Sequence, residues 1–173
     1  MNRFGQKIEA ALAKIPSFGA ADGVTLLRDE EFYSDLRSMA IGHDDTVVPA
    51  WGATAEPSAK EFTLVMSENG QAIGQMSVSI EHNEDGTSPT LEAVFVDEAY
   101  RGTGVARKLA DAVVALLTEA VIAAEAETPG VHDYFDPYFT GDTNEGGDAI
   151  MSMMSGTMEA NLEKVPENGP QPE

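Results

Sequence analysis

The spacing of hydrophobic positions changes along the chain, and each change predicts a different element. Residues 4–15 and 105–124 carry apolar side chains at intervals of three and four, which is typical of amphipathic helices. Residues 61–67 and 72–80 alternate apolar and polar side chains, which indicates strands with one buried face. Residues 91–96 form a short apolar run that suits a further strand.

Turn signals separate these segments. Asn69 and Gly70 stand between the two alternating runs, so a hairpin turn is predicted over residues 68–71. A second polar turn is expected over residues 82–89. Upstream, residues 24–28 suit a first strand and residues 29–41 a helix, followed by an irregular stretch over residues 42–57. The predicted order is therefore helix, strand, helix, hairpin, strand, turn and long helix.

The chain after the long helix gives weaker signals. Prolines at 129 and 137 leave only residues 134–138 as a brief strand. Asp148 is a plausible N-cap for a helix over residues 149–164, and residues 165–173 form an extended tail. An apolar face of this helix comprises Met151, Met154, Met158 and Leu162. We expect this methionine face to dock on the open edge of the chain's own sheet; a surface of another chain is the alternative.

The joint between the strand at 91–96 and the long helix has the character of an anion-binding site. Gly102 and Gly104 allow a tight turn and a close approach of the backbone to a ligand. The first N–H groups of a helix have no partner inside it, and its dipole places partial positive charge there. Arg101, Arg107 and Lys108 add basic side chains at the same place. This arrangement is suited to holding phosphate groups.

The segment from Val96 to Ala106 resembles the acyl-CoA-binding motif of the GNAT superfamily of N-acyltransferases. That motif, Arg/Gln-x-x-Gly-x-Gly/Ala, joins the fourth strand to the next helix; here it reads Arg101-Gly102-Thr103-Gly104-Val105-Ala106 after Tyr100. The resemblance implies that these six residues hold the pyrophosphate of acetyl-CoA, the acyl donor. It also implies that Phe95 and Val96 pair with the pantetheine chain.

The resemblance also implies a fold class. We expect an α/β fold of the α+β type, in which a mixed, mostly antiparallel sheet is flanked by helices. The predicted order matches the family over residues 24–124, whereas the fifth strand and the closing pair of strands have no clear candidates. The expected division is an N-terminal helical extension (1–22), a GNAT-like core (23–127), a divergent loop and helix (128–164) and a tail (165–173).

Two side chains are candidates for the acid–base chemistry that the resemblance implies. Glu92, on the strand beside the expected thioester, would be the general base, although a solvent-facing role is an alternative. The family's acid is a tyrosine after the fifth strand, for which Tyr134 is our candidate and packing under a loop the alternative. His82 and Glu81 are weaker candidates for the base.

Composition limits the remaining possibilities. The chain has 30 acidic and 10 basic residues, a formal charge of −20, no cysteine and three histidines. We therefore expect no nucleic-acid partner, no disulfide and no metal site. We also expect no membrane span, because no apolar run is long enough, and a cytoplasmic location.

Two functions remain at this point. The first is an acetyl-CoA-dependent N-acyltransferase that acts on an amine of a small molecule or on a protein lysine. The second is a non-catalytic GNAT-like subunit of a large assembly such as a virion. In that case the N-terminal and C-terminal helices would contact an assembly partner or a second copy.

Overall fold

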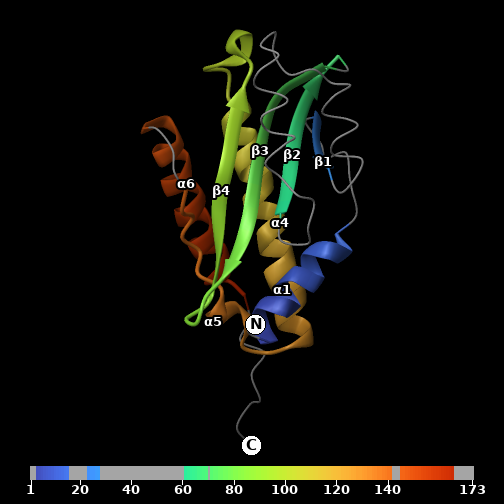
Figure 1. Ribbon diagram of the computed structural model, residues 1–173, viewed down its shortest axis with the longest axis vertical. Helices are drawn as coiled ribbons and strands as arrows, with labels where there is room; N and C mark the ends of the chain where they lie inside the picture. The colour runs from blue at the N-terminus through green and yellow to red at the C-terminus, as the bar shows by residue number, and fades with distance from the viewer. Residues whose placement is uncertain (1–2, 16–22, 28–60, 70, 142–144, 166–173) are drawn as a thin grey trace, which may run out of the picture.

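The computed structural model of the protein describes residues 3–15, 23–27, 61–69, 71–141 and 145–165. The helix expected over 29–41, the irregular stretch over 42–57 and most of the expected tail lie outside the described residues. Among the described residues the fold is a sheet with helices packed on one face and at one edge (Figure 1). The expected α+β class is confirmed.

Four antiparallel strands form the sheet in the order β1-β2-β3-β4. They are β1 (Val24–Leu27), β2 (Glu61–Glu68), β3 (Gln71–His82) and β4 (Thr87–Val96). The hairpin predicted from Asn-Gly joins β2 to β3, where Asn69 has a φ of 53°. Asparagine tolerates this left-handed conformation better than most residues, which explains its position in the turn.

The strand β4 begins at Thr87, four residues earlier than the sequence predicts. The turn before it is correspondingly short, and the Asn83 side chain accepts the N–H groups of Asp85 and Gly86 at 2.9 and 2.8 Å. Pro89, which made this stretch read as a turn, pairs with Ile80, and its carbonyl accepts the Thr140 N–H on the other side. A proline is tolerated where the missing N–H faces away from the neighbouring strand.

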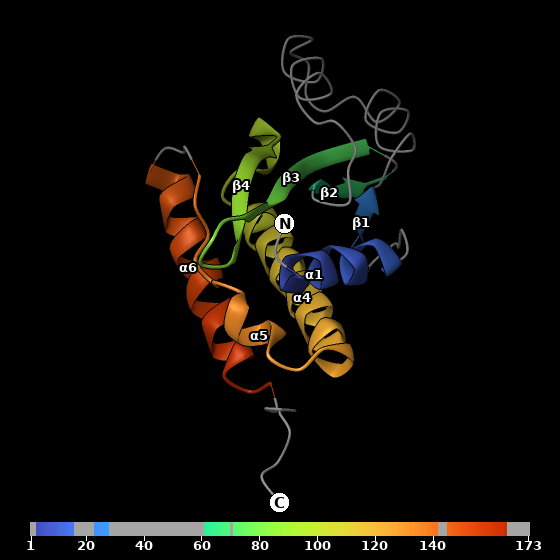
Figure 2. The same ribbon diagram turned by 60° about the horizontal axis from the view of Figure 1, so that its bottom comes forward.

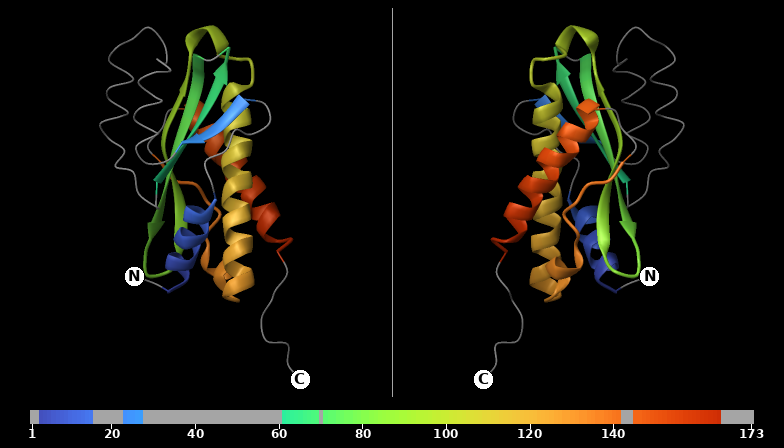
Figure 3. Two further views of the ribbon diagram at one scale, coloured as in Figure 1. Left: turned by 90° about the vertical axis from the view of Figure 1, so that its right-hand side faces the viewer. Right: turned by 90° about the vertical axis from the view of Figure 1, so that its left-hand side faces the viewer.

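One face of the sheet is covered by α4 (Val105–Glu127), as the edge-on views in Figure 3 show. Its buried stripe includes Leu109, Val113 and Leu117. The N-terminal helix α1 (Arg3–Lys14) packs on α4 at the far end of the molecule, with Ile8 and Leu12 fully buried (Figure 2). It therefore packs on its own domain. Within the described ranges, no helix has the length and apolar character needed to cross a membrane.

The end of α4 is held by a buried carboxylate. Glu125 is 1% exposed, and its oxygens accept the N–H groups of Gly130 and His132 at 3.0 Å. Burial alone would raise the pKa of Glu125, but these backbone donors and the His132 ring together lower it below its usual value. The carboxylate is thus charged in the folded protein and fixes the loop between α4 and α5 (Val131–Tyr134).

The strand expected over residues 134–138 is not formed. Tyr134 ends α5, and the following residues run beside β4 through two isolated parallel bridges, Thr87 with Phe135 and Thr90 with Thr140. The last helix, α6 (Glu145–Leu162), begins earlier than expected, so Asp148 lies inside it and is not its N-cap. The expected start was too late because Gly146 and Gly147 have low helix propensity and suggest a loop, whereas the helix includes both of them.

The methionine face docks within the chain, as expected, but on a different surface. Met154 and Met158 are fully buried, and α6 packs on α4, where Thr118 Oγ1 lies 3.4 Å from Met158 Sδ. On its other side, Ser155 Oγ accepts the Phe139 N–H at 2.9 Å. The expectation of docking directly on the sheet edge was wrong, because residues 135–140 lie beside that part of β4.

Candidate functional site

The glycine turn lies at the end of the molecule opposite α5, between β4 and α4 (Figure 1). A short 3₁₀ helix, η2 (Glu98–Tyr100), opens the turn, and Asp97 caps it by accepting the Ala99 N–H at 3.0 Å. Gly102 and Gly104 have φ values of 76° and 92°, a region that favours glycine. The sequence therefore uses each glycine where the backbone requires one.

The turn opens onto free space. Residues 101–104 are exposed, and a Cβ added at Gly102 or Gly104 would meet no heavy atom within 4 Å. In the described part of the chain, the N–H groups of Gly102, Gly104, Val105 and Ala106 have no backbone acceptor. The expected geometry, an open turn ahead of a helix, is confirmed. It leaves several backbone donors at a positive helix end, which suits an anionic group.

Three neighbouring side chains shape this turn. The N–H and hydroxyl of Thr103 both donate to the Tyr100 carbonyl, at 3.3 and 2.5 Å, and Arg101 Nε donates to the Val96 carbonyl at 3.2 Å. The Glu68 carboxylate raises the pKa of Tyr100 because it accepts a hydrogen bond from the phenol. The Arg101 contact with Val96 fastens the turn to the end of β4, and the Tyr100 contact with Glu68 fastens it to the end of β2. The protein therefore holds the turn in place without a ligand.

The strand that leads to the turn has an available edge. Leu91 donates its N–H to Thr140, and the last bridge between β4 and that segment is at Thr90. Asp97 donates its N–H to the Ile73 carbonyl at 2.8 Å. By the two-residue alternation of an antiparallel ladder, the backbone of Phe95 also faces β3, and Val94 and Val96 face outward. Backbone pairing with an extended ligand would thus use Val94 and the N–H of Val96, whose carbonyl already accepts Arg101 Nε, and would not use Phe95 as expected.

Glu92 occupies a β-bulge. Ser77 pairs with Ala93 and Val78 pairs with Leu91, so Glu92 is the extra residue on β4. Its side chain is exposed and accepts a hydrogen bond from the Ser79 hydroxyl. Bulges re-aim side chains and are frequent beside active sites. The bulge and Ser79 both escaped the sequence analysis, because register is set by pairing and not by local composition.

The sequence matches the family model of the acetyltransferase (GNAT) family over residues 26–134, more than half of the chain. The chain belongs to the GNAT acetyltransferase family. GNAT enzymes transfer an acetyl group from acetyl-CoA to an amine, and this general activity comes to the protein with its family. The match includes β4, the turn and α4, and it ends at Tyr134.

Solved GNAT structures resemble the fold at low sequence identity. One is the aminoglycoside N-acetyltransferase AAC(6')-Iy in complex with CoA, at 18% identity and a TM-score of 0.47, covering 76% of this chain and 88% of that chain. Another is the aminoglycoside acetyltransferase meta-AAC0020 from an uncultured soil metagenomic sample, at 12% identity and a TM-score of 0.45, covering 87% and 91%. No curated protein matches the sequence.

Tyr134, expected as the acid of this GNAT site, lies far from it. It follows the C-terminal end of α4, whereas the turn precedes the N-terminal end. The 23 residues of α4 separate the two by about 34 Å, at a rise of about 1.5 Å per residue. The Tyr134 hydroxyl donates to the Asn83 carbonyl at 3.0 Å, and its ring packs on Phe4. Its role is packing under the loop, and it is not part of the site.

The weaker candidates for the base also have other positions. His82 lies at the far end of β3, where its ring contacts Thr87 Oγ1 at 2.7 Å and the Glu9 carboxylate. This cluster holds α1 against the β3–β4 hairpin. Among the described residues there is no group of three acidic or histidine side chains that could hold a metal ion.

Proposed function

We propose that this GNAT protein acetylates a cationic amine, with the turn at residues 101–104 holding the acetyl donor and Glu92 acting as general base. The observation that carries the proposal is that β4 carries both the bulge that presents Glu92 and, at its end, the open turn. The open turn follows the end of β4, and the bulge that presents Glu92 lies five residues before Asp97, about 17 Å along an extended strand.

The residues of the turn fit acetyl-CoA. The donors that would hold the anionic pyrophosphate are the N–H groups of Gly102, Gly104, Val105 and Ala106, and the outward backbone of Val94 and the N–H of Val96 would pair with the pantetheine chain. When bound, acetyl-CoA supplies an activated acetyl group. The turn is exposed, and no heavy atom lies within 4 Å of either glycine's Cβ position, so its backbone donors are open to a ligand.

The chain's own part in the chemistry is the removal of a proton. An alkylammonium cannot attack until it loses a proton, and a carboxylate within reach, directly or through one water, can take it. Glu92 Oε1 accepts the hydrogen bond of Ser79, which orients the carboxylate and leaves Oε2 for the proton. Ser79 is a positioning residue in this scheme.

The acceptor is a small-molecule amine or a protein lysine. The chain's formal charge of −20 attracts cationic acceptors and repels anionic ones. Polyamines and lysine side chains carry the required charge and amine. The assembly-subunit alternative would use the C-terminal helix to contact a partner, but Met154 and Met158 of that helix are buried within the chain.

Thiol release from acetyl-CoA with a panel of amines tests the proposal. Glu92→Gln should lower kcat/KM by about 10²- to 10⁴-fold, the usual contribution of a general base. Acetyl-CoA affinity, measured by calorimetry, should stay within twofold. Ser79→Ala should lower kcat/KM less, and Ser79→Thr, which keeps the hydroxyl, should restore it, which a merely structural serine would not do.

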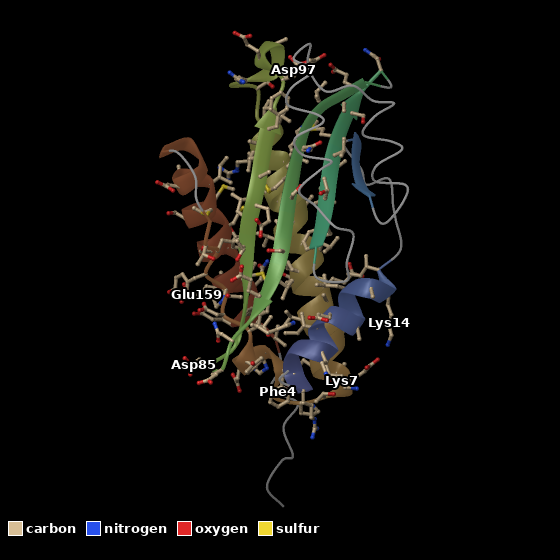
Figure 4. The ribbon with its side chains drawn as sticks, in the orientation of Figure 1. Phe4, Lys7, Lys14, Asp85, Asp97 and Glu159 are labelled. Carbon is tan, nitrogen blue, oxygen red and sulfur yellow. The ribbon has the colours of Figure 1, made fainter. Side chains whose placement is uncertain are left out.

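Glu159→Gln is the matched control, since Glu159 is exposed on α6 (Figure 4). A Glu92→Gln enzyme as active as this control would refute the assignment of the base. A wild-type protein that neither binds acetyl-CoA nor releases thiol with any amine would refute the proposed function itself.

A further inference from the structure

The sheet face turned away from α4 carries a row of polar side chains. A Cβ at Gly74 would meet Val105 and Leu109, so Gly74 and the residues in step with it face α4. The alternate residues of β3 therefore point to the other face, which Figure 4 views. We call five polar residues of this face the polar strip; they are Thr63, Gln75, Ser77, Ser79 and Glu92.

Most members of the polar strip are paired. Thr63 Oγ1 and Ser77 Oγ lie 2.7 Å apart, and Ser79 donates to Glu92. Gln75 is the exception: it is 1% exposed, and neither its amide oxygen nor its amide nitrogen has a hydrogen-bond partner among the described residues. Its cross-strand neighbours, Val65 and Phe95, are apolar. A buried amide without a partner destabilises a fold, so the lack of one for Gln75 in the described part of the chain calls for an explanation by function.

We infer that the Gln75 amide is a specificity-determining group that binds a second polar group of the acceptor, while the reacting amine lies at Glu92. This inference rests on the proposed function. A primary amide offers two donors and an acceptor oxygen, so it can bind a hydroxyl or a second amine. Ser77 and Phe95 beside it are partly exposed, so the polar strip reaches solvent next to Gln75.

The register fixes the span of the acceptor. Gln75 lies two residues from Ser77, whose partner Ala93 adjoins the bulged Glu92. This separates the two backbones by about 7 Å along the strand and about 5 Å across it, on the order of 9 Å in all. The acceptor class is therefore an amine that carries a hydroxyl or second amine several bonds from the reacting nitrogen. A plain alkylamine leaves Gln75 unpaired.

Three acceptors of matched length test this class, namely putrescine, 4-amino-1-butanol and n-pentylamine. The wild-type protein should prefer the first two by at least tenfold in kcat/KM. Gln75→Met and Gln75→Leu should abolish the preference, mainly by raising KM for the polar acceptors, and leave acetyl-CoA affinity unchanged. Both variants should melt at or above the wild-type temperature, because an apolar side chain replaces an unpaired polar one. Gln6→Leu, on the exposed side of α1, is the matched control.

Each outcome decides the inference. Equal use of the three amines by the wild-type protein would overturn it and leave the proposed function standing, whereas absence of any acetyl transfer would remove the proposed function. A preference that survives in both Gln75 variants would also overturn it. Loss of folding in both variants would show that the amide has a structural partner, which contradicts the inference.

Discussion

Gly104→Asp is the sharpest test of the turn, because it should change ligand binding and leave folding nearly intact. Gly104 is exposed, and its Cβ position is empty to 4 Å, so the new side chain meets no protein atom. Its φ of 92° costs an L-residue about 1–2 kcal/mol, less for Asp than for most. A carboxylate at a helix N-terminus returns about 0.3–1 kcal/mol. The net loss of stability is about 1 kcal/mol, and Tm should fall by about 2–4 °C.

Gly104→Asp should weaken acetyl-CoA binding more than it weakens folding, and nothing offsets the loss of affinity. The turn is exposed, so the dielectric constant of water is the appropriate lower limit to the repulsion. At about 6 Å in water, each negative charge of the pyrophosphate repels the carboxylate by about 0.7 kcal/mol. Two charges give about 1.4 kcal/mol, which corresponds to about a tenfold loss of affinity. Arg101→Ala should lose less, because backbone donors carry the contact.

Calorimetric titration with acetyl-CoA measures this effect, with two control variants. Gly104→Asn adds the same shape without charge, and Gly156→Asp adds the charge at another open position on α6. The difference in acetyl-CoA affinity between Gly104→Asp and Gly104→Asn should shrink at about 1 M salt, where the Debye length is about 3 Å. If the Asp variant binds acetyl-CoA as tightly as the wild-type protein, the turn does not hold phosphate and the reasoning is wrong.

Two further predictions concern the opposite end of the protein. Changing Met154 and Met158 together to Asp buries two unpaired carboxylates and should abolish folding, seen as loss of the cooperative melting transition. The double Leu variant should stay within about 3 kcal/mol of wild type, and a well-folded Asp variant would contradict the buried docking. Glu125→Gln should cost about 1.5–3 kcal/mol at pH 7 by urea unfolding. The pKa of Glu125 is lowered in the folded protein, so its carboxylate stabilises the fold at pH values above its unfolded pKa of about 4.3. Below that pH, the difference in free energy of unfolding between the wild-type protein and the Gln variant should narrow. A gap that is constant down to pH 3 would contradict the charge-based account.

Sequence reasoning succeeded where a local rule decides the structure. The Asn-Gly pair predicts the hairpin because asparagine tolerates a left-handed backbone, and Asn69 indeed has a positive φ. Gly102 and Gly104 identified the turn for the same reason. The long apolar stripe of α4 predicted both the helix and the side of it that is buried, because residues at that spacing share one face only in a helix.

It failed where partners distant in sequence decide. The sequence around Pro89 does not show that the Pro89 carbonyl will accept the Thr140 N–H at the edge of the sheet. The predicted start of β4 was therefore too late. Glu92 was chosen as base from its strand position, but the bulge that presents it arises from pairing with β3. Tyr134 was chosen because the resemblance calls for a tyrosine after a fifth strand, whereas residues 134–138 form no such strand.

A single continuous helix, α4, carries the exposed donor turn at its first residue and the buried Glu125 near its last. Residues 101–104 are exposed, so a substitution there changes ligand contacts more than it changes the packing of the rest of the chain. The packed end, where α1, α5 and α6 meet α4, tolerates far less change. One helix thus divides the work: a change at its first turn acts on donor binding, and a change at its packed end acts on folding stability.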